Sequence, residues 1–282
     1  MENILNKISI DNVKKIFGNK DNAIEYLTYI KSISFKELKT LTSNEVYSLV
    51  INNWNYSEAK GIVRYLSKNS KYNVENFQKN CRLYEHVKNI IDTQYDGNIE
   101  WAFTPNSYDS NLTHHIRKAS VFDDGLQKHL KDNEKNYIIK SYNLYRSYLY
   151  EYFIIKYHED ILPTMGNKNG VDFYYLGKRK DLKNASSVTN NFKNDYGDSW
   201  FDTALKNPEI VAKYLYENQN ETRFGYEDRI YIVQLNRNTA TINGIERICR
   251  DLNFSDPFTV DFKYKLNNKE ENYTAESLVA FI

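Results

Sequence analysis

Long hydrophobic runs are missing from this chain of 282 residues. No stretch approaches the roughly eighteen apolar residues that a membrane-spanning helix needs, so no span is predicted. Residues 1–15 also lack the basic-then-apolar order of a secretory signal. We therefore expect a cytoplasmic protein with no membrane partner.

Cysteine is scarce, and glycine-rich phosphate loops are absent. Cys81 and Cys249 lie far apart with no metal-ligand spacing, which argues against a structural zinc site and a disulfide framework. Neither GxxxxGK(S/T) nor GxGxxG occurs, so ATPases and Rossmann dehydrogenases are excluded. The net charge of +1 provides no global attraction to nucleic acid, and any DNA contact must depend on a local cluster of cations.

The composition that is present is that of a folded protein. Apolar residues make up 41% and charged residues 27%, with ten glycines and four prolines. Aromatic residues reach 15%, including 25 tyrosines, which suits binding surfaces but is also what an AT-rich genome would encode.

Helical periodicity dominates the first half of the chain. It covers residues 1–90, including a basic amphipathic segment at 55–73 with Lys60, Arg64 and Lys68, which we interpret as a solvated face. The strongest pattern runs from 134 to 162 and is apolar around most of its circumference, which predicts a central core helix. We expect a helical region over 1–95, for DNA recognition or dimerisation, followed by a core with insertions over 96–282.

From about residue 160 the pattern becomes strand-like. A strand, a helical crossover and the buried run RIYIVQLNRN form a βαβ order, which predicts parallel pairing. FTVDFKYKL and YTAESLVAF predict a closing hairpin. The fold class expected is α/β, or α+β with a mixed sheet.

The stretch GVDFYYLGKRKDLKNA, residues 170–185, predicts a tight hairpin about Gly177. With Gly177 and Lys178 as the loop, Asp172 would lie opposite Lys183. With Leu176 and Gly177 as the loop, Asp172 would lie opposite Asp181. Either two-residue loop gathers Asp172, Asp181 and Lys183 on one face and leaves Phe173 and Leu182 on the other, whereas an odd loop would separate the aspartates.

Two carboxylates at one cross-strand spacing repel each other, so a cation is expected between them. Mg²⁺ is typically held by one or two carboxylates, with water and substrate phosphate completing its shell. A lysine beside such a site can orient or deprotonate a water and hold a phosphate. The pattern therefore favours phosphodiester hydrolysis.

Asp172, eight intervening residues and then Asp181-Leu182-Lys183 resemble the PD-(D/E)XK nuclease motif, although Val171 stands where that motif has proline. The resemblance covers about residues 140–236. It implies a restriction-endonuclease-like core in which Asp172 and Asp181 bind Mg²⁺ and Lys183 positions the water. Because some members add a carboxylate from the preceding helix, Glu151 is a third metal-ligand candidate.

The resemblance implies a type II restriction enzyme, a site-specific deoxyribonuclease that cuts double-stranded DNA as a homodimer, with a cognate methyltransferase encoded nearby. Candidate DNA contacts are cationic residues around the hairpin and beyond the buried strand: Lys178, Arg179, Arg237, Arg247 and Arg250. Two alternatives stay open: a repair or junction-resolving nuclease, and a non-catalytic nucleic-acid-binding protein.

Other charged patterns have simpler explanations. The triplets at 37–39 and 58–60 lie in helical contexts, and the triplet at 261–263 is preceded only by Asp251, at the end of an expected helix. His114 and His115 have no triad or zinc partner at a recognisable spacing, so we interpret them as solvated or capping side chains.

Overall fold

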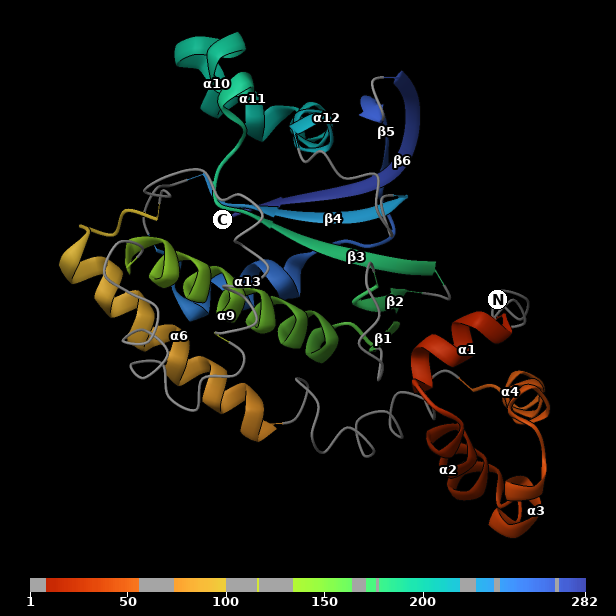
Figure 1. Cartoon of the computed structure of the whole chain (residues 1–282). Helices are drawn as coiled ribbons and strands as arrows, with labels where there is room; N and C mark the ends of the chain where they lie inside the picture. Colours follow the sequence, from red (N-terminus) through yellow and green to blue (C-terminus); the bar gives the residue numbers. More distant parts are fainter. Residues whose placement is uncertain are drawn as a thin grey trace.

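The computed structural model describes residues 9–55, 74–99, 116, 134–163, 171–175, 178–218, 227–235, 239–266 and 269–282. These residues form a mixed α/β protein, with helices on both faces of a six-stranded mixed sheet (Figure 1). None of the helices in this part of the chain is long and apolar enough to cross a membrane.

Four short helices open the chain beside the β1–β2 end of the sheet (Figure 1). They are α1 (Ile10–Phe17), α2 (Lys20–Lys31), α3 (Phe35–Thr40) and α4 (Ser43–Asn52). The start of α4 shows how the local sequence sets a boundary, because Thr42 and Glu45 bond each other's backbone N–H in a capping box. The apolar faces of these helices form one cluster, which also takes in Leu162 and Tyr174 of the first two strands. The basic segment expected at 55–73 lies outside the described residues after Asn55.

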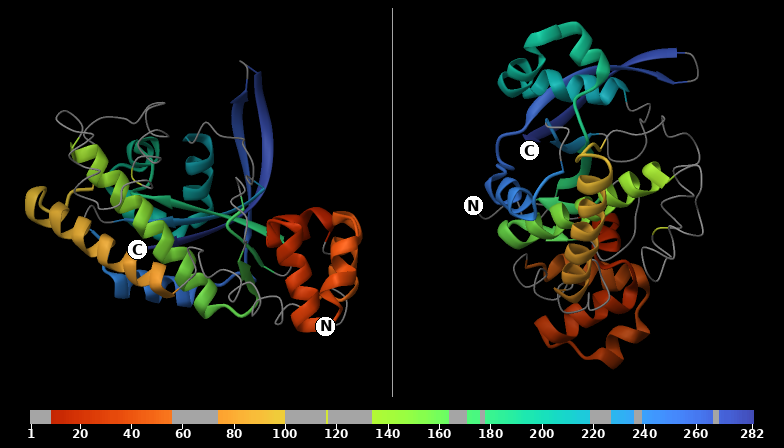
Figure 2. Two further views of the ribbon diagram at one scale, coloured as in Figure 1. Left: turned by 60° about the horizontal axis from the view of Figure 1, so that its bottom comes forward. Right: turned by 90° about the vertical axis from the view of Figure 1, so that its left-hand side faces the viewer.

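Two long helices, α6 (Val74–Gln94) and α9 (Glu134–Tyr157), pack against each other below the sheet (Figures 1 and 2). Aromatic side chains make their contact: the Tyr84 hydroxyl donates to the Tyr142 hydroxyl at 3.1 Å, and the Phe77 and Tyr152 rings stack 3.7 Å apart. Many of the tyrosines therefore belong to the core. Buried residues of α1–α4 form one hydrophobic cluster, and those of α6 belong to another, together with α9, Leu182 and Ile230.

The helical pattern that we expected to continue to Leu162 ends earlier. Helix α9 stops at Tyr157, and Ile161–Pro163 form strand β1. A turn lies between them, in which the Ile161 N–H donates to the His158 carbonyl. Leu162 also precedes Pro163, and a residue before proline disfavours helical backbone angles.

The sheet has the order β1-β2-β3-β4-β6-β5. Its remaining strands are β2 (Phe173–Tyr175), β3 (Lys178–Ala185), β4 (Asp228–Val233), β5 (Phe258–Leu266) and β6 (Lys269–Phe281). Strands β3 and β4 pair in parallel, as the βαβ order predicted, and β5 with β6 forms the expected antiparallel hairpin. Strands β4 and β6 are also parallel, whereas β1, β2 and β3 are antiparallel neighbours.

Helices cover the two faces of the sheet differently. The crossover from β3 to β4 contains α10 (Asn190–Tyr196), the 3-10 helix η2 (Gly197–Ser199), α11 (Trp200–Lys206) and α12 (Pro208–Asn218). It packs on the face that includes Tyr231 and Val233, which we call the α12 face (Figure 1). Helices α9 and α13 (Ile242–Asp251) pack on the other side, the α9 face, against Leu182 and Ile230. Because side chains alternate along a strand, the neighbours of Leu182 and Ile230 point to the α12 face.

Candidate active site

The β2–β3 hairpin has the register that one of the two predicted loops requires. Tyr175 pairs with Lys178, and Phe173 pairs with Lys180, so only Leu176 and Gly177 separate the strands. Phe173 and Leu182 are both buried in the cluster on the α9 face, as expected. Because side chains alternate along β3, Asp181 and Lys183, on either side of Leu182, point together to the α12 face.

Asp172 ends the β2–β3 ladder. Its backbone N–H donates to the Lys180 carbonyl at 2.9 Å, and its Oδ2 accepts the Leu182 N–H at 2.8 Å. The two bonds straddle Asp181 in the facing strand. The register of the strands, continued by one residue, would place Asp172 opposite Asp181. The two hydrogen bonds likewise hold Asp172 next to Asp181.

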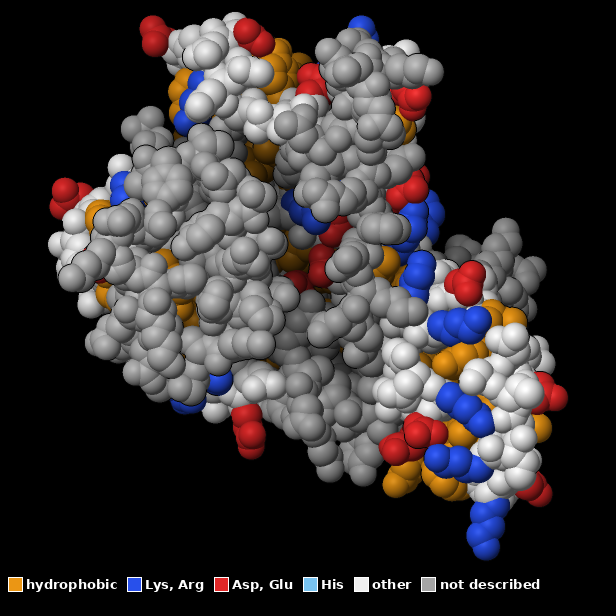
Figure 3. All heavy atoms as spheres, in the orientation of Figure 1, with side chains coloured by type: hydrophobic (Ala, Val, Ile, Leu, Met, Phe, Trp, Pro, Cys, Tyr) orange, Lys and Arg blue, Asp and Glu red, His pale blue; other side chains and the backbone are white. Residues whose placement is uncertain are grey.

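Asp181 is the buried centre of the site. The residue is 3% exposed, and the Lys183 ammonium lies 3.0 Å from both of its carboxylate oxygens. Burial raises the pKa of Asp181; Lys183 and Arg229 oppose that rise, and the nearby charge of Asp172 adds to it. The Lys183 side chain is 32% exposed, so solvent reaches the site through the lysine. In Figure 3, acidic and basic side chains meet in a hollow over the middle of the molecule, where β3 runs in Figure 1.

Arg229 is a fourth member of the site, which we did not predict. It is the parallel-strand partner of Asp181 on β4, is 1% exposed, and places Nε 3.3 Å from Asp181 Oδ2. Its guanidinium lies over the Tyr216 ring, 5.4 Å from the centroid, and contacts the Tyr231 hydroxyl at 3.5 Å. A single arginine at the start of an otherwise apolar strand was the available signal.

Glu151 is not brought together with the aspartates. It is buried on α9, whose side chains pack on the α9 face, opposite Asp181. Among the described residues, no group of three or more His, Cys, Asp or Glu side chains is arranged to hold a metal ion. Within the described ranges, the site therefore offers two carboxylates, Asp172 and Asp181.

The donor set fits a hard divalent cation with two protein ligands. Carboxylate oxygens suit Mg²⁺, and water with substrate phosphate commonly completes its shell. Burial and the nearby charge of Asp172 raise the pKa of Asp181, whereas Lys183 and Arg229 act to lower it. A divalent cation held by the two aspartates would likewise favour their ionised form.

The candidate DNA contacts do not gather around this site. Lys178 pairs with Glu276 at 3.0 Å, and Arg179 pairs with Glu227 at 2.5 Å, both near the start of β3. Arg247 and Arg250 are exposed on α13, which packs on the α9 face, opposite Asp181. Arg237 lies outside the described residues.

The competing charged patterns have local partners. Asp261 is exposed on β5 and accepts a bond from Thr274 Oγ1 at 2.6 Å, whereas Asp251 ends α13 and pairs with Arg250. Residues 58–60, His114 and His115 lie outside the described residues.

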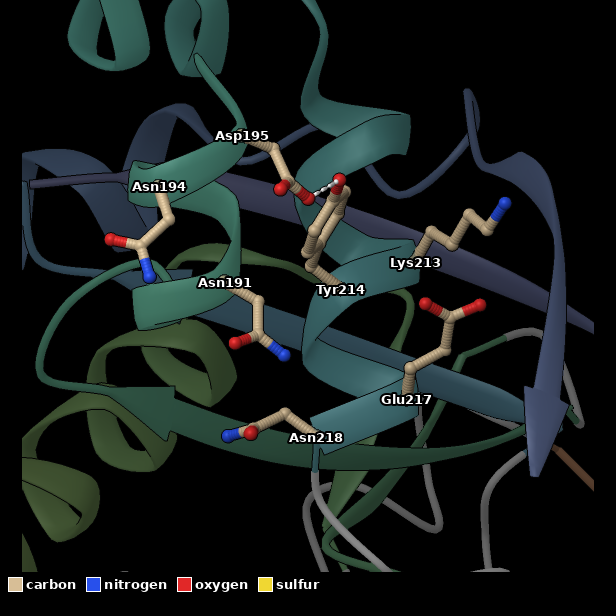
Figure 4. Close-up of a pocket in the computed structure, with 7 residues that line it drawn as sticks. All are labelled: Asn191, Asn194, Asp195, Lys213, Tyr214, Glu217 and Asn218. Carbon is tan, nitrogen blue, oxygen red and sulfur yellow. Dashed lines mark hydrogen bonds between the residues drawn. The ribbon is translucent and has the colours of Figure 1, made fainter. Parts of the chain in front are cut away.

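A second hollow lies between α10 and α12 (Figure 4). It has a volume of about 530 Å³, and its lining residues are Asn191, Asn194, Asp195, Lys213, Tyr214, Glu217 and Asn218. The Tyr214 hydroxyl donates to Asp195 Oδ2 at 2.6 Å, which raises the pKa of Tyr214 to about 12. Two carboxylates against one lysine make this hollow unfavourable for a phosphate, so the nuclease chemistry is better sought at Asp181.

Comparisons of the chain with protein-family models, with curated proteins and with solved structures found no match.

Proposed function

We propose that this protein is a Mg²⁺-dependent endonuclease that hydrolyses phosphodiester bonds of double-stranded DNA. The observation that carries the proposal is the placement of Asp172, Asp181 and Lys183. Two residues separate β2 from β3, Asp172 bonds across the hairpin, and Lys183 contacts the buried Asp181. The order of a long helix, a β-hairpin, a helical crossover and a parallel strand supports a restriction-endonuclease-like core.

The residues have separate tasks in this mechanism. Asp172 and Asp181 would hold a divalent cation, which when bound would stabilise the negative charge that develops on the scissile phosphate. Lys183 is the exposed member, and its ammonium can leave Asp181 to orient the attacking water or contact a phosphate oxygen. Water adds to phosphorus, the bond to the leaving oxygen breaks, and protons pass from the water to solvent and to the leaving oxygen.

The biological role that we favour is restriction by a homodimer, in which two sites related by a two-fold axis cut both strands of a symmetric sequence. A repair or junction-resolving nuclease would use the same site. Non-catalytic binding is the remaining alternative, and a specific observation favours it: both oxygens of Asp181 already contact Lys183, with Arg229 beside Oδ2, which is also how a purely structural ion cluster is built.

The test is cleavage of several plasmids by the full chain with Mg²⁺, with EDTA as the control. Discrete, reproducible fragments support a restriction enzyme, and cutting confined to branched or damaged substrates supports the repair role. Asp181→Asn should abolish cutting while the protein still shifts DNA in a gel. Intact DNA across all substrates, or an Asp181→Asn variant that cuts at the wild-type rate, would contradict the proposal.

A further inference from the structure

Arg229 differs from Lys183 in how it is held at Asp181. The arginine is 1% exposed, and its position on β4 fixes it beside β3. The Tyr216 ring and the Tyr231 hydroxyl contact its guanidinium. The Lys183 side chain is 32% exposed, so it has room to move into solvent. Of the two cations at Asp181, only the lysine is free to move toward a substrate.

The two cations also contact the carboxylate differently. Lys183 lies 3.0 Å from both oxygens, whereas the Arg229 contact is Nε to Oδ2 at 3.3 Å. If Lys183 turned away, Oδ1 would lose this contact and Oδ2 would keep its contact with Arg229. The carboxylate would then present one oxygen, in a fixed orientation, to an incoming cation.

We infer that Arg229 is a positioning residue that holds Asp181 by Oδ2 so that Oδ1 is presented to the divalent cation. This inference rests on the proposed nuclease function. Arg229 acts through Asp181 and contacts no substrate, because its side chain is buried beneath α12. Arg229 could change the affinity for the cation in either direction. Its positive charge alone would repel the cation and weaken binding, whereas holding the Asp181 carboxylate in place would strengthen it.

The chain offers a matched control in Arg146. This arginine on α9 is also 1% exposed and also lies over tyrosine rings, but its side-chain partners are the neutral Gln234 and Asn143. Removing its guanidinium carries a comparable burial penalty without touching Asp181. If the loss of Mn²⁺ binding and activity is due only to removing a buried arginine, Arg229→Met and Arg146→Met should therefore both show it.

The experiment compares Arg229→Met, Arg229→Lys and Arg146→Met in the full chain, each checked for folding by circular dichroism. Binding of Mn²⁺ alone is measured by electron paramagnetic resonance, and cleavage of a plasmid cut by the wild type is measured at saturating Mg²⁺. We expect Arg229→Met to weaken Mn²⁺ binding and to lower kcat by about tenfold to a hundredfold, as misplacing a catalytic group does. The KM for DNA should change by less than about twofold, since Arg229 does not reach the substrate.

Arg229→Lys should recover part of both losses, and Arg146→Met should bind Mn²⁺ and cut DNA like the wild type. Equal or tighter Mn²⁺ binding by a folded Arg229→Met, with kcat within about twofold of wild type, would overturn the inference. Where Arg229→Met does not fold, Arg229→Lys decides: wild-type Mn²⁺ affinity and kcat in that variant overturn it. A wild-type chain that neither binds Mn²⁺ nor cuts DNA overturns the proposed function, and this inference with it.

Discussion

Strand β3 carries a buried ion network on each of its faces, and the two networks differ in how they are closed. On the α9 face, Lys180 and Asp228 pair at 2.5 Å, with side chains 4% and 16% exposed, and the more exposed pair of Lys178 and Glu276 lies beside them. On the α12 face, Lys183 and Arg229 contact Asp181, and the nearby charge of Asp172 raises the pKa of Asp181. The lysine that contacts the buried carboxylate is itself buried on the α9 face, whereas on the α12 face the corresponding lysine is 32% exposed.

This difference separates a structural ion pair from a candidate site. Burial raises the pKa of Asp228 as it raises that of Asp181, so a raised carboxyl pKa does not by itself mark chemistry on this strand. What distinguishes the α12 face is that solvent reaches the lysine that contacts the buried carboxylate itself. Substitutions on the two faces should therefore have separable effects.

After the complete loss expected for Asp181→Asn, the largest effect is expected for Lys183→Ala. Loss of the mobile cation should lower the cleavage rate by about 10²–10⁴-fold, the range for a general acid–base group. Stability should fall by less than in Asp228→Asn, because Arg229 remains beside the buried Asp181. Single-turnover cleavage and urea unfolding of the same preparation measure both quantities. If Lys183→Ala cuts at the wild-type rate, the two faces do not differ in the way that we describe.

Asp228→Asn should have the opposite profile. It leaves the Lys180 ammonium buried without its carboxylate, which should lower the free energy of unfolding by about 3 kcal/mol. Cleavage per folded molecule should stay at the wild-type level. The double variant Lys180→Met/Asp228→Leu replaces the pair with apolar groups and should recover most of the stability in urea unfolding. A large loss of kcat in folded Asp228→Asn would place this pair in the chemistry.

Glu151→Gln tests whether α9 contributes to the site from the opposite face. Because Glu151 does not join the aspartates in a metal-binding group, we expect a fall in kcat of less than about tenfold, against the complete loss expected for Asp181→Asn. The dependence of the rate on Mg²⁺ concentration should stay unchanged. A loss as complete as that of Asp181→Asn would make Glu151 a third ligand.

The smallest effect is expected at the exposed rim of the α9-face network. The Lys178 hydrogen bond lowers the pKa of Glu276 below its ordinary value of 4.5. A depressed carboxyl pKa stabilises the fold above the ordinary value, and this contribution is lost as the pH falls through the depressed one. Lys178→Met should therefore cost at most about 1 kcal/mol at pH 7. Thermal melts between pH 7 and pH 3 should show the difference from wild type disappearing in acid, and a difference that persists at pH 3 would exclude this cause.

Local pattern in the sequence predicted much of the hairpin. Alternation on either side of Gly177 indicated two strands, and the burial of Phe173 with Leu182 followed from the same alternation. The choice between two loops one residue apart was not decided locally, since both have two residues and both keep the side-chain parity. Pairing of β2 with β1 and of β3 with β4 holds the register in which Phe173 faces Lys180.

Residues that are distant in the sequence could not be assigned to the site. Arg229 lies 48 positions after Asp181, and it enters the site because β3 and β4 pair in parallel with these two residues opposite each other. Glu151 was within reach as a residue of the preceding helix, but which face of the sheet α9 covers depends on long-range packing. The same packing carries Arg247 and Arg250 to the face opposite Asp181.

The sequence by itself determined the alternation of β3, and with it that Asp181 and Lys183 share a face, because the side-chain period of a strand is a local property. Only the tertiary structure decided that this face receives Arg229 and lies under α12, while α9 and its Glu151 cover the other. These placements depend on strand pairing and helix packing between segments far apart in the chain, and those contacts leave no local periodicity to read.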